Sequence, residues 1–268
     1  MKRLSIFAIA LIASLTSSVA LAFDQQHATW DQLLKKHVVW IDNGVASQVD
    51  YAGFQRDSAQ LQSYLQSLSE VSQAEFDSWN KDQQLAFLIN AYNAFTIDLI
   101  LTEYPQVESI KDLGSFLQSP WKKRFFTLLG QERHLDELEH EMIRAKGVYD
   151  EPRIHVAVVC ASIGCPALRD EAYVADRLDA QLEDSFKRFL SDRSRNRYNP
   201  QAGKLEVSKI FSWYKEDFDD GRFSSLNDMF ARYADLLADA PATRQRIQQG
   251  NVPIDYLDYD WALNDVRG

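Results

Sequence analysis

The strongest structural signal in the chain is a helical pattern over residues 82–103. Large apolar side chains recur there every three or four positions, which is the spacing that places them on one buried face of a helix. Pro105 follows the pattern and is expected to end the helix. The apolar side chains concerned are Leu85, Leu88, Tyr92, Phe95 and Leu99.

Patterns elsewhere predict further helices and, in the middle of the chain, a few short strands. Because helices outnumber strands and the strands cluster, we predict an α+β fold, mainly helical with a small central antiparallel or mixed sheet. Hairpins are expected over 124–135 and 198–207, and a buried strand over 154–159. A helix is expected to start at Cys165-Pro166, since proline is favoured in the first turn of a helix. Further helices are expected at about 28–37, 54–68, 136–145, 176–190, 208–218, 226–237 and 243–249.

The first 22 residues have the pattern of an export signal. Lys2 and Arg3 precede an apolar run from Leu4 to Leu15, and Ala20-Leu21-Ala22 has the small-x-small form of a cleavage site. The apolar run is shorter than the roughly 20 residues that span a bilayer. We therefore expect a mature chain of residues 23–268 that is periplasmic or secreted, with no stable membrane insertion after cleavage. No Gly-, Pro- or Ser-rich linker divides it, which predicts a single domain.

The charge of the chain disfavours nucleic acid as a partner. Loss of the signal would remove two positive charges and change the formal net charge from −10 to −12. Binding to nucleic acid or to an anionic membrane depends on Lys and Arg meeting phosphates. A hydrophobic content of 46% indicates a packed core rather than disorder.

Residues that carry chemistry concentrate between positions 139 and 169. Cys160 and Cys165 are the only cysteines of the sequence and lie five positions apart. In an oxidising compartment an even cysteine count predicts a disulfide, which would stabilise the fold by only about 2 kcal/mol because it closes a short loop. The alternative is a reactive thiol at Cys165, since free N–H groups at a helix start lower a thiol pKa. Both interpretations stay open.

A thiol nucleophile needs a base and a group that orients the base. His140 or His155 can supply the base and Glu139 the orienting carboxylate. A strand over 154–159 would place His155 about 16 Å from the strand end, whereas His140 comes from another element. The resulting hypothesis is a hydrolase or acyltransferase acting on amide or ester bonds, with Cys165 as the nucleophile and the following helix start binding the oxyanion.

Several polar side chains are candidates for ligand contacts. Asn90 and Asn93 lie three positions apart on the long helix and form either a buried hydrogen-bond network or a contact to a polar ligand. Arg144, Arg153 and Arg169 either pair with nearby carboxylates or recognise a carboxylate or phosphate of a ligand. The expected ligand is a small molecule or is peptide-like. The sequence lacks the usual metal-binding spacings, so we expect no metal and no cofactor. A zinc site is the third hypothesis, beside a thiol-dependent enzyme and a protein without a catalytic role.

Aromatic residues are frequent towards the C-terminal end. Trp213 and Tyr214 are expected to belong to the core. Asp260-Trp261 and Asn264 are expected to lock the end of the chain onto the domain.

Several short motifs, taken in order, resemble a known family. They are N-x-x-N around Tyr92, L-x-E-L-E-H-x-x-x-R, E-P-R-I-H-V-A, C-A-S-x-G-C-P-x-L-R, S-K-I-F-x-W-Y and Y-D-W-x-L-N. From about Trp30 to Asn264 the chain is similar to the domain of unknown function 547 family, in its bacterial exported branch. The resemblance implies that the motif residues are typical of that family and leaves the activity open. The alternative to an enzyme is therefore a non-catalytic periplasmic binding or assembly module with a Cys160–Cys165 disulfide.

Overall fold

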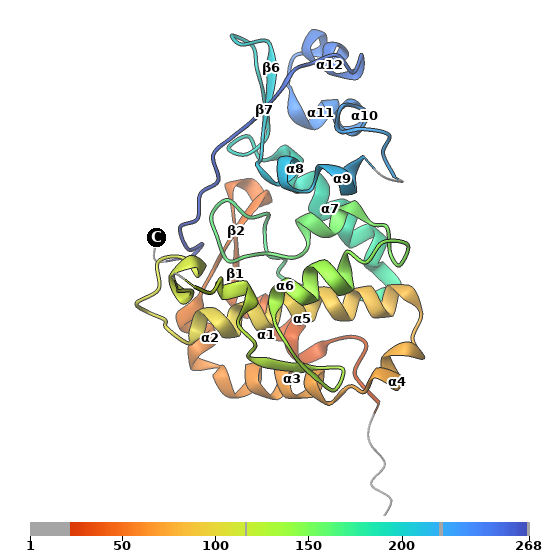
Figure 1. The fold of residues 1–268 in the computed structure, drawn as a ribbon. Coiled ribbons are helices and arrows are strands. Elements are labelled where there is room, and N and C mark those ends of the chain that lie inside the picture. The colour runs from red at the N-terminus through yellow and green to blue at the C-terminus, as the bar shows by residue number, and fades with distance from the viewer. Residues whose placement is uncertain (1–21, 116, 220–221, 267–268) are drawn as a thin grey trace, which may run out of the picture.

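A long helix, α5 (Lys81–Leu101), runs through the centre of the molecule (Figure 1). The computed structural model describes residues 22–115, 117–219 and 222–266. The side chain of Asn80 accepts a hydrogen bond from the backbone N–H of Gln83, whose side chain accepts one from the N–H of Asn80, so both ends of this capping box are satisfied. Helix α5 is long and apolar enough to cross a membrane, but nearly all of it is buried inside the protein.

Short helices and hairpins surround α5. The elements before it are α1 (Ala28–His37), β1 (Val38–Ile41), β2 (Ala46–Val49), α2 (Tyr51–Arg56), α3 (Ser58–Glu70) and α4 (Gln73–Asp77). The elements after it, up to the β5–β6 hairpin, include 3-10 helices at Ile110–Leu113 and Pro120–Lys122, β3 (Phe126–Leu128), β4 (Gln131–Arg133), α6 (Leu135–Glu137), a π-helical turn (Leu138–Ile143), a 3-10 helix (Pro152–Val156) and α7 (Leu178–Ser191). The last elements are β5 (Arg197–Asn199), β6 (Lys204–Val207), α8 (Ile210–Trp213), α9 (Lys215–Phe218), α10 (Leu226–Arg232), α11 (Ala234–Leu237), α12 (Pro241–Gln248) and β7 (Ile254–Tyr256).

Two hydrophobic clusters form the core. The first surrounds α5 and includes side chains of α1, α2 and α3. The second lies between α7, the β5–β7 sheet and the helices α8 to α12. The 3-10 helix at Pro152–Val156 joins them, because Ile154 packs in the first cluster and Val156 in the second. Figure 1 shows the second group of elements, coloured cyan to blue, above the α5 layer.

The α+β class and the predominance of helix are confirmed, but the strands form three small sheets instead of one. Strands β1 and β2, and β3 and β4, form two antiparallel hairpins. Strand β6 pairs antiparallel with β5 and parallel with β7, which gives a mixed three-stranded sheet. The hairpins at 124–135 and 198–207 are thus confirmed, whereas β1–β2 was not predicted.

The predicted strand over 154–159 is wrong. Pro152–Val156 forms a 3-10 helix, and the side chain of Glu151 accepts from the N–H of Arg153 at its start. The side chain of Asn93 binds the next backbone groups, donating to the carbonyl of Ala157 and accepting from the N–H of Val159. An apolar run buried on all sides has no periodicity that separates strand from helix.

The predicted helix after Cys165-Pro166 is also wrong. The chain stays irregular there until a 3-10 turn at Ala175–Arg177 leads into α7. Side chains of neighbouring helices bind its backbone instead: Asn90 holds both backbone groups of Tyr173, at 2.7 and 3.0 Å. The oxyanion site expected at a helix start after Cys165 therefore has no structural basis.

Two further expectations are corrected in detail. The helix predicted over 54–68 is two helices, α2 and α3, which are separated at Asp57. The helix predicted over 136–145 begins one residue earlier, is capped by the side chain of His134, and changes to a π-helical turn at Leu138. The predicted export signal lies outside the described residues, except for its last residue, Ala22.

Candidate functional site

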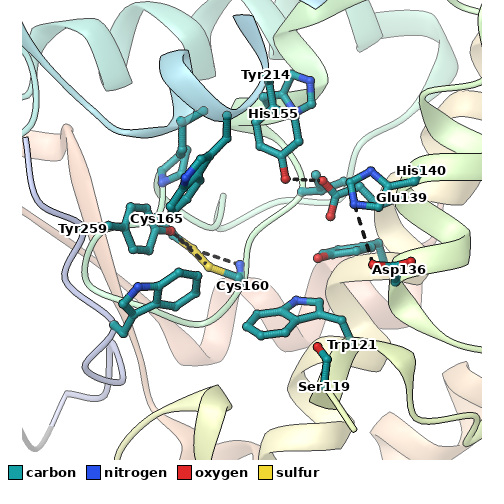
Figure 2. A pocket seen from close by; sticks show the side chains of 16 residues that line it. Ser119, Trp121, Asp136, Glu139, His140, His155, Cys160, Cys165, Tyr214 and Tyr259 are labelled. Atoms are coloured by element: carbon teal, nitrogen blue, oxygen red, sulfur yellow. Dashed lines mark hydrogen bonds and ion pairs between the residues drawn. A yellow bond between two sulfur atoms is a disulfide. The ribbon is translucent and has the colours of Figure 1, made fainter. Parts of the chain in front are cut away.

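A cavity of about 310 Å³ is lined by residues of both hydrophobic clusters (Figure 2). The four side chains proposed from sequence as catalytic, Glu139, His140, His155 and Cys165, line it together with Cys160. The fold therefore brings together at one cavity the side chains of adjacent Glu139 and His140, of His155 and of the two cysteines, which come from three segments of the chain. The remaining lining residues are Tyr92, Ser119, Trp121, Asp136, Val158, Pro166, Ile210, Trp213, Tyr214, Tyr259 and Trp261.

Glu139 is a buried carboxylate in the cavity wall, and only 6% of its surface is exposed. It lies in the π-helical turn, where the N–H of Arg144 donates to the Glu139 carbonyl at 2.9 Å. Its Oε1 accepts a 2.7 Å hydrogen bond from the Tyr214 hydroxyl. Burial and the neighbouring Glu139 carboxylate raise the pKa of Tyr214 well above its usual value, so Tyr214 remains a donor.

His155 projects from the 3-10 helix and is almost fully buried. Its Nε2 donates to Oδ2 of Asp217 at 2.7 Å, and its ring stacks on that of Tyr214 with 3.8 Å between the ring centroids. Burial lowers the pKa of His155, and the hydrogen bond to Asp217 opposes this only in part. His155 is therefore a neutral imidazole at neutral pH.

Asp217, on α9, joins His155 to Arg144. The Nε of Arg144 donates to Asp217 Oδ2 at 2.6 Å, and a terminal nitrogen donates to Oδ1 at 3.1 Å. Burial acts to raise the pKa of Asp217, but the hydrogen bonds from His155 and Arg144 outweigh it and hold that pKa well below its usual range. Arg144 itself does not line the cavity.

His140 lies at the cavity rim and is held by Arg144. A terminal nitrogen of Arg144 lies 2.5 Å from Nδ1 of His140. A guanidinium can only donate, so Nδ1 must accept and the ring carries its single proton on Nε2. That nitrogen lies 3.9 Å from Oδ1 of Asp136. His140 can accept a proton from a substrate only after its contact with Arg144 is broken.

Cys160 and Cys165 form a disulfide in the cavity wall. The Tyr259 hydroxyl lies 3.0 Å from the sulfur of Cys165 and 3.1 Å from that of Cys160 (Figure 2). The N–H of Cys160 also points at the sulfur of Cys165, at 2.9 Å. In the described part of the chain, neither sulfur has an imidazole as a hydrogen-bond partner.

The C-terminal segment forms another part of the wall. The N–H of Gly164 donates to the carbonyl of Asp260 and that of Ile163 to the carbonyl of Ala262, both at 2.8 Å. Asn264 accepts from the Tyr51 hydroxyl at 2.7 Å, so the expectation that Asn264 locks the chain end is confirmed. These contacts hold the segment against the disulfide loop.

Six aromatic side chains surround the cavity. Trp213 is 45% exposed, and its ring centroid lies 4.9 Å from that of Tyr259 and 5.8 Å from that of Trp261. The expectation that Trp213 belongs to the core is therefore wrong. The six are Tyr92, Trp121, Trp213, Tyr214, Tyr259 and Trp261.

Asn90 and Asn93 lie away from the cavity lining. Both are buried, and both bind backbone groups of the irregular segment between residues 157 and 173. Of the two interpretations left open from sequence, the structure shows the buried hydrogen-bond network.

Arg153 and Arg169 are held in ion-pair networks outside the cavity. Arg153 is 1% exposed and its guanidinium binds the carboxylates of Glu151, Asp179 and Glu183. Arg169 pairs with two other carboxylates. These partners are Glu171 and Asp184.

The sequence analysis did not identify Asp217 as a site residue, nor most of the aromatic residues that line the cavity. Asp217 follows three residues after the S-K-I-F-x-W-Y motif, which was the available signal. Tyr259 and Trp261 belong to a motif that was interpreted only as a lock for the chain end.

In the ranges 22–115, 117–219 and 222–266, no group of three or more His, Cys, Asp or Glu side chains is placed to hold a metal ion.

Comparison with known proteins gives one match. Residues 76–190 match the model of a family described as "Protein of unknown function, DUF547", which supports the resemblance to the domain of unknown function 547 family. The matched span includes Glu139, His155 and the disulfide, but not Tyr214 or Asp217. No curated protein and no solved structure matches the chain.

Proposed function

We propose that the chain is an exported ligand-binding protein whose cavity takes a small-molecule or peptide-like ligand, with the Cys160–Cys165 disulfide as part of the wall. One observation carries this proposal. The sulfurs and both imidazoles of the cavity already have partners within the protein, whereas six aromatic side chains line a hollow beside a buried carboxylate. Pockets of this kind, apolar with a few polar groups, bind small ligands. The disulfide is consistent with export, since such bonds persist in oxidising compartments.

A screen of small molecules by thermal unfolding tests the binding function. The protein is purified without reductant, and its intact mass should be two hydrogen masses below that of the reduced chain. We expect cavity ligands to raise the melting temperature, because they bind only the folded state. Trp213→Ala should abolish those shifts, whereas Leu117→Ala, at a 91% exposed position, should leave them unchanged. Shifts that survive Trp213→Ala would place the ligand elsewhere and contradict the proposal.

A second candidate function is a thiol-dependent hydrolase or acyltransferase acting on amide or ester bonds. It is favoured by the position of Cys165, His140, His155 and Glu139 around one cavity. An external dithiol would first reduce the disulfide and itself be oxidised. The Cys165 sulfur would then bond to the carbonyl carbon while the bond to the leaving amine or alcohol breaks and the leaving group takes the thiol proton. Water would hydrolyse the thioester and restore the thiol.

Two single substitutions test this second function. The reduced protein is assayed for hydrolysis of p-nitrophenyl acetate, with the unreduced protein as the blank. A thiol-dependent enzyme should lose activity in Cys165→Ser and keep it in Cys160→Ser. Equal activity of the two variants, or no activity in the reduced wild type, would exclude Cys165 as the nucleophile.

A further inference from the structure

The charged groups that face the cavity are acidic. Glu139 and Asp136 contribute two carboxylates to the lining. Of the two imidazoles, His140 accepts from Arg144 at Nδ1, and His155, whose pKa is lowered by burial, donates to Asp217, so neither contributes a cation to the lining. Among the described residues that line the cavity there is no Lys or Arg. An anionic ligand would therefore meet two like charges and no cationic side chain in the lining itself.

Two arginines that contact the cavity wall or its neighbouring backbone are engaged within the protein. Arg144 is bound to both oxygens of Asp217. Arg195 donates to the backbone carbonyl of Ile163 and pairs with Asp192. Neither arginine offers its charge to a ligand in the cavity.

Two aromatic rings of the lining already hold a cation of the protein over their faces. The Lys111 ammonium lies 3.7 Å from the centroid of the Trp261 ring, and the Arg144 guanidinium lies 4.9 Å from that of Tyr214. Aromatic faces attract cations through their quadrupole, and sites for quaternary ammonium groups are built from several such rings. Trp213, which lines the cavity, is 45% exposed, although burial would normally favour covering so large a side chain.

We infer that the ligand of this cavity carries a cationic amine or quaternary ammonium group, which is seated between the Glu139 carboxylate and the aromatic rings of Trp121 and Trp213; the face of Trp261 is already taken by the Lys111 ammonium. The inference rests on the proposed binding function and adds the chemical class of the ligand. Glu139 supplies the countercharge and the rings replace water around the apolar part of the cation. A neutral polyhydroxylated ligand would use the same rings but would gain nothing from the charge of Glu139.

Three probes of nearly the same shape separate charge from fit. Choline is the cation, 3,3-dimethyl-1-butanol is its neutral isostere, and 3,3-dimethylbutanoate is an anion with the same apolar end. Binding to the full protein, purified without reductant, is measured by calorimetry and by tryptophan fluorescence. We expect choline to bind at least about tenfold more tightly than the alcohol and the anion not to bind.

Two substitutions with matched controls locate the effect. Glu139→Gln keeps a hydrogen-bond acceptor for Tyr214 and should weaken choline binding about tenfold. The control Glu132→Gln removes one charge from an exposed position of β4 and should leave binding unchanged. If Glu139→Gln does not fold, Trp213→Ala at the exposed rim replaces it, with Leu117→Ala as control, and should also weaken binding.

Three results would overturn the inference. They are equal or tighter binding of the neutral alcohol, choline binding that is unaffected in the cavity variants, and no saturable choline binding at all. In the first case the cavity binds ligands and only the ligand class is wrong. The other two cases leave the binding function to be judged by the ligand screen with Trp213→Ala.

Discussion

Asp217 holds His155 and Arg144 at the same time, and Arg144 in turn holds His140. Because Oδ2 accepts from both His155 and Arg144, one carboxylate fixes the orientation of two side chains directly and of a third through Arg144. The imidazoles at the cavity are therefore fixed parts of its wall. Tyr214 completes the arrangement, since it stacks on His155 and donates to Glu139.

A buried histidine outside the cavity predicts how stability depends on pH. Burial lowers the pKa of His27 to about 4, against a weaker opposing effect of Asp24. A lowered pKa in the folded state means that the stabilisation is complete above about pH 6.5 and is lost as the pH falls towards 4. We expect the free energy of unfolding to decrease between pH 7.5 and 4.5, by about 2 kcal/mol from His27 alone.

The substitution His27→Asn isolates this contribution. Asparagine tolerates the left-handed backbone at this position, where φ is 49°. Urea unfolding at both pH values should show a smaller decrease in the variant. The same decrease in variant and wild type would exclude His27 as the source.

The buried guanidinium of Arg153 predicts a large loss of stability on substitution. Arg153→Met should destabilise the fold by about 3 kcal/mol, because Glu151 and Glu183 would lose the charge that compensates them. Arg177→Met is the control, since the Arg177 side chain is 54% exposed and its pair with Glu171 should contribute less than about 1 kcal/mol. Chemical denaturation measures the free energy of unfolding of both variants. A similar loss of stability in the two would contradict this prediction.

At the scale of elements, an irregular segment between residues 157 and 174 carries the disulfide and part of the cavity. Two helices supply the hydrogen bonds that a neighbouring strand would otherwise provide. Asn90 and Asn93 act from α5, and Gln181 acts from α7 by binding the backbone of Ala172 and Val174. Buried backbone groups need such partners, which explains why polar side chains occur on buried faces of these helices.

This role predicts the effect of Asn93→Ala. The substitution leaves the N–H of Val159 and the carbonyl of Ala157 without their partner, and we expect a loss of about 2–4 kcal/mol in the free energy of unfolding. Thr96→Val on the same helix is the matched control, because the buried Thr96 hydroxyl has no partner among the described residues. Thermal unfolding should show the control to be neutral or stabilised, and equal losses in both variants would argue against the role of Asn93.

The contact between the disulfide loop and the C-terminal segment allows a second test at this scale. A Cβ added at Gly164 would lie 2.9 Å from the carbonyl oxygen of Asp260, so backbone would have to move. Gly164→Ala should therefore speed hydrogen exchange in residues 259–264 while residues of α5 keep their protection. Unchanged exchange in the C-terminal segment would mean that the contact is not needed to hold it.

At the scale of the whole molecule, the sequence predicts those elements whose side chains follow a local repeat. The 3–4 spacing identifies α5 as a helix, although the helix is buried on all sides rather than on one face, and turn residues identify two hairpins. The segment 154–159 is buried on every side, so its pattern cannot tell a strand from a 3-10 helix. Tyr259 lies beside the disulfide because the C-terminal segment passes over the loop that carries the disulfide. No local sequence pattern indicates that long-range contact.

The central claim is that the aromatic cavity beside the disulfide is the ligand site, and crystallographic fragment screening tests it most directly. Crystals are grown without reductant and soaked with a chemically diverse set of small molecules. The account predicts that fragments collect between Glu139 and Trp213 while the Cys160–Cys165 bond stays intact. Fragments that gather at other surfaces and leave this cavity empty would contradict it.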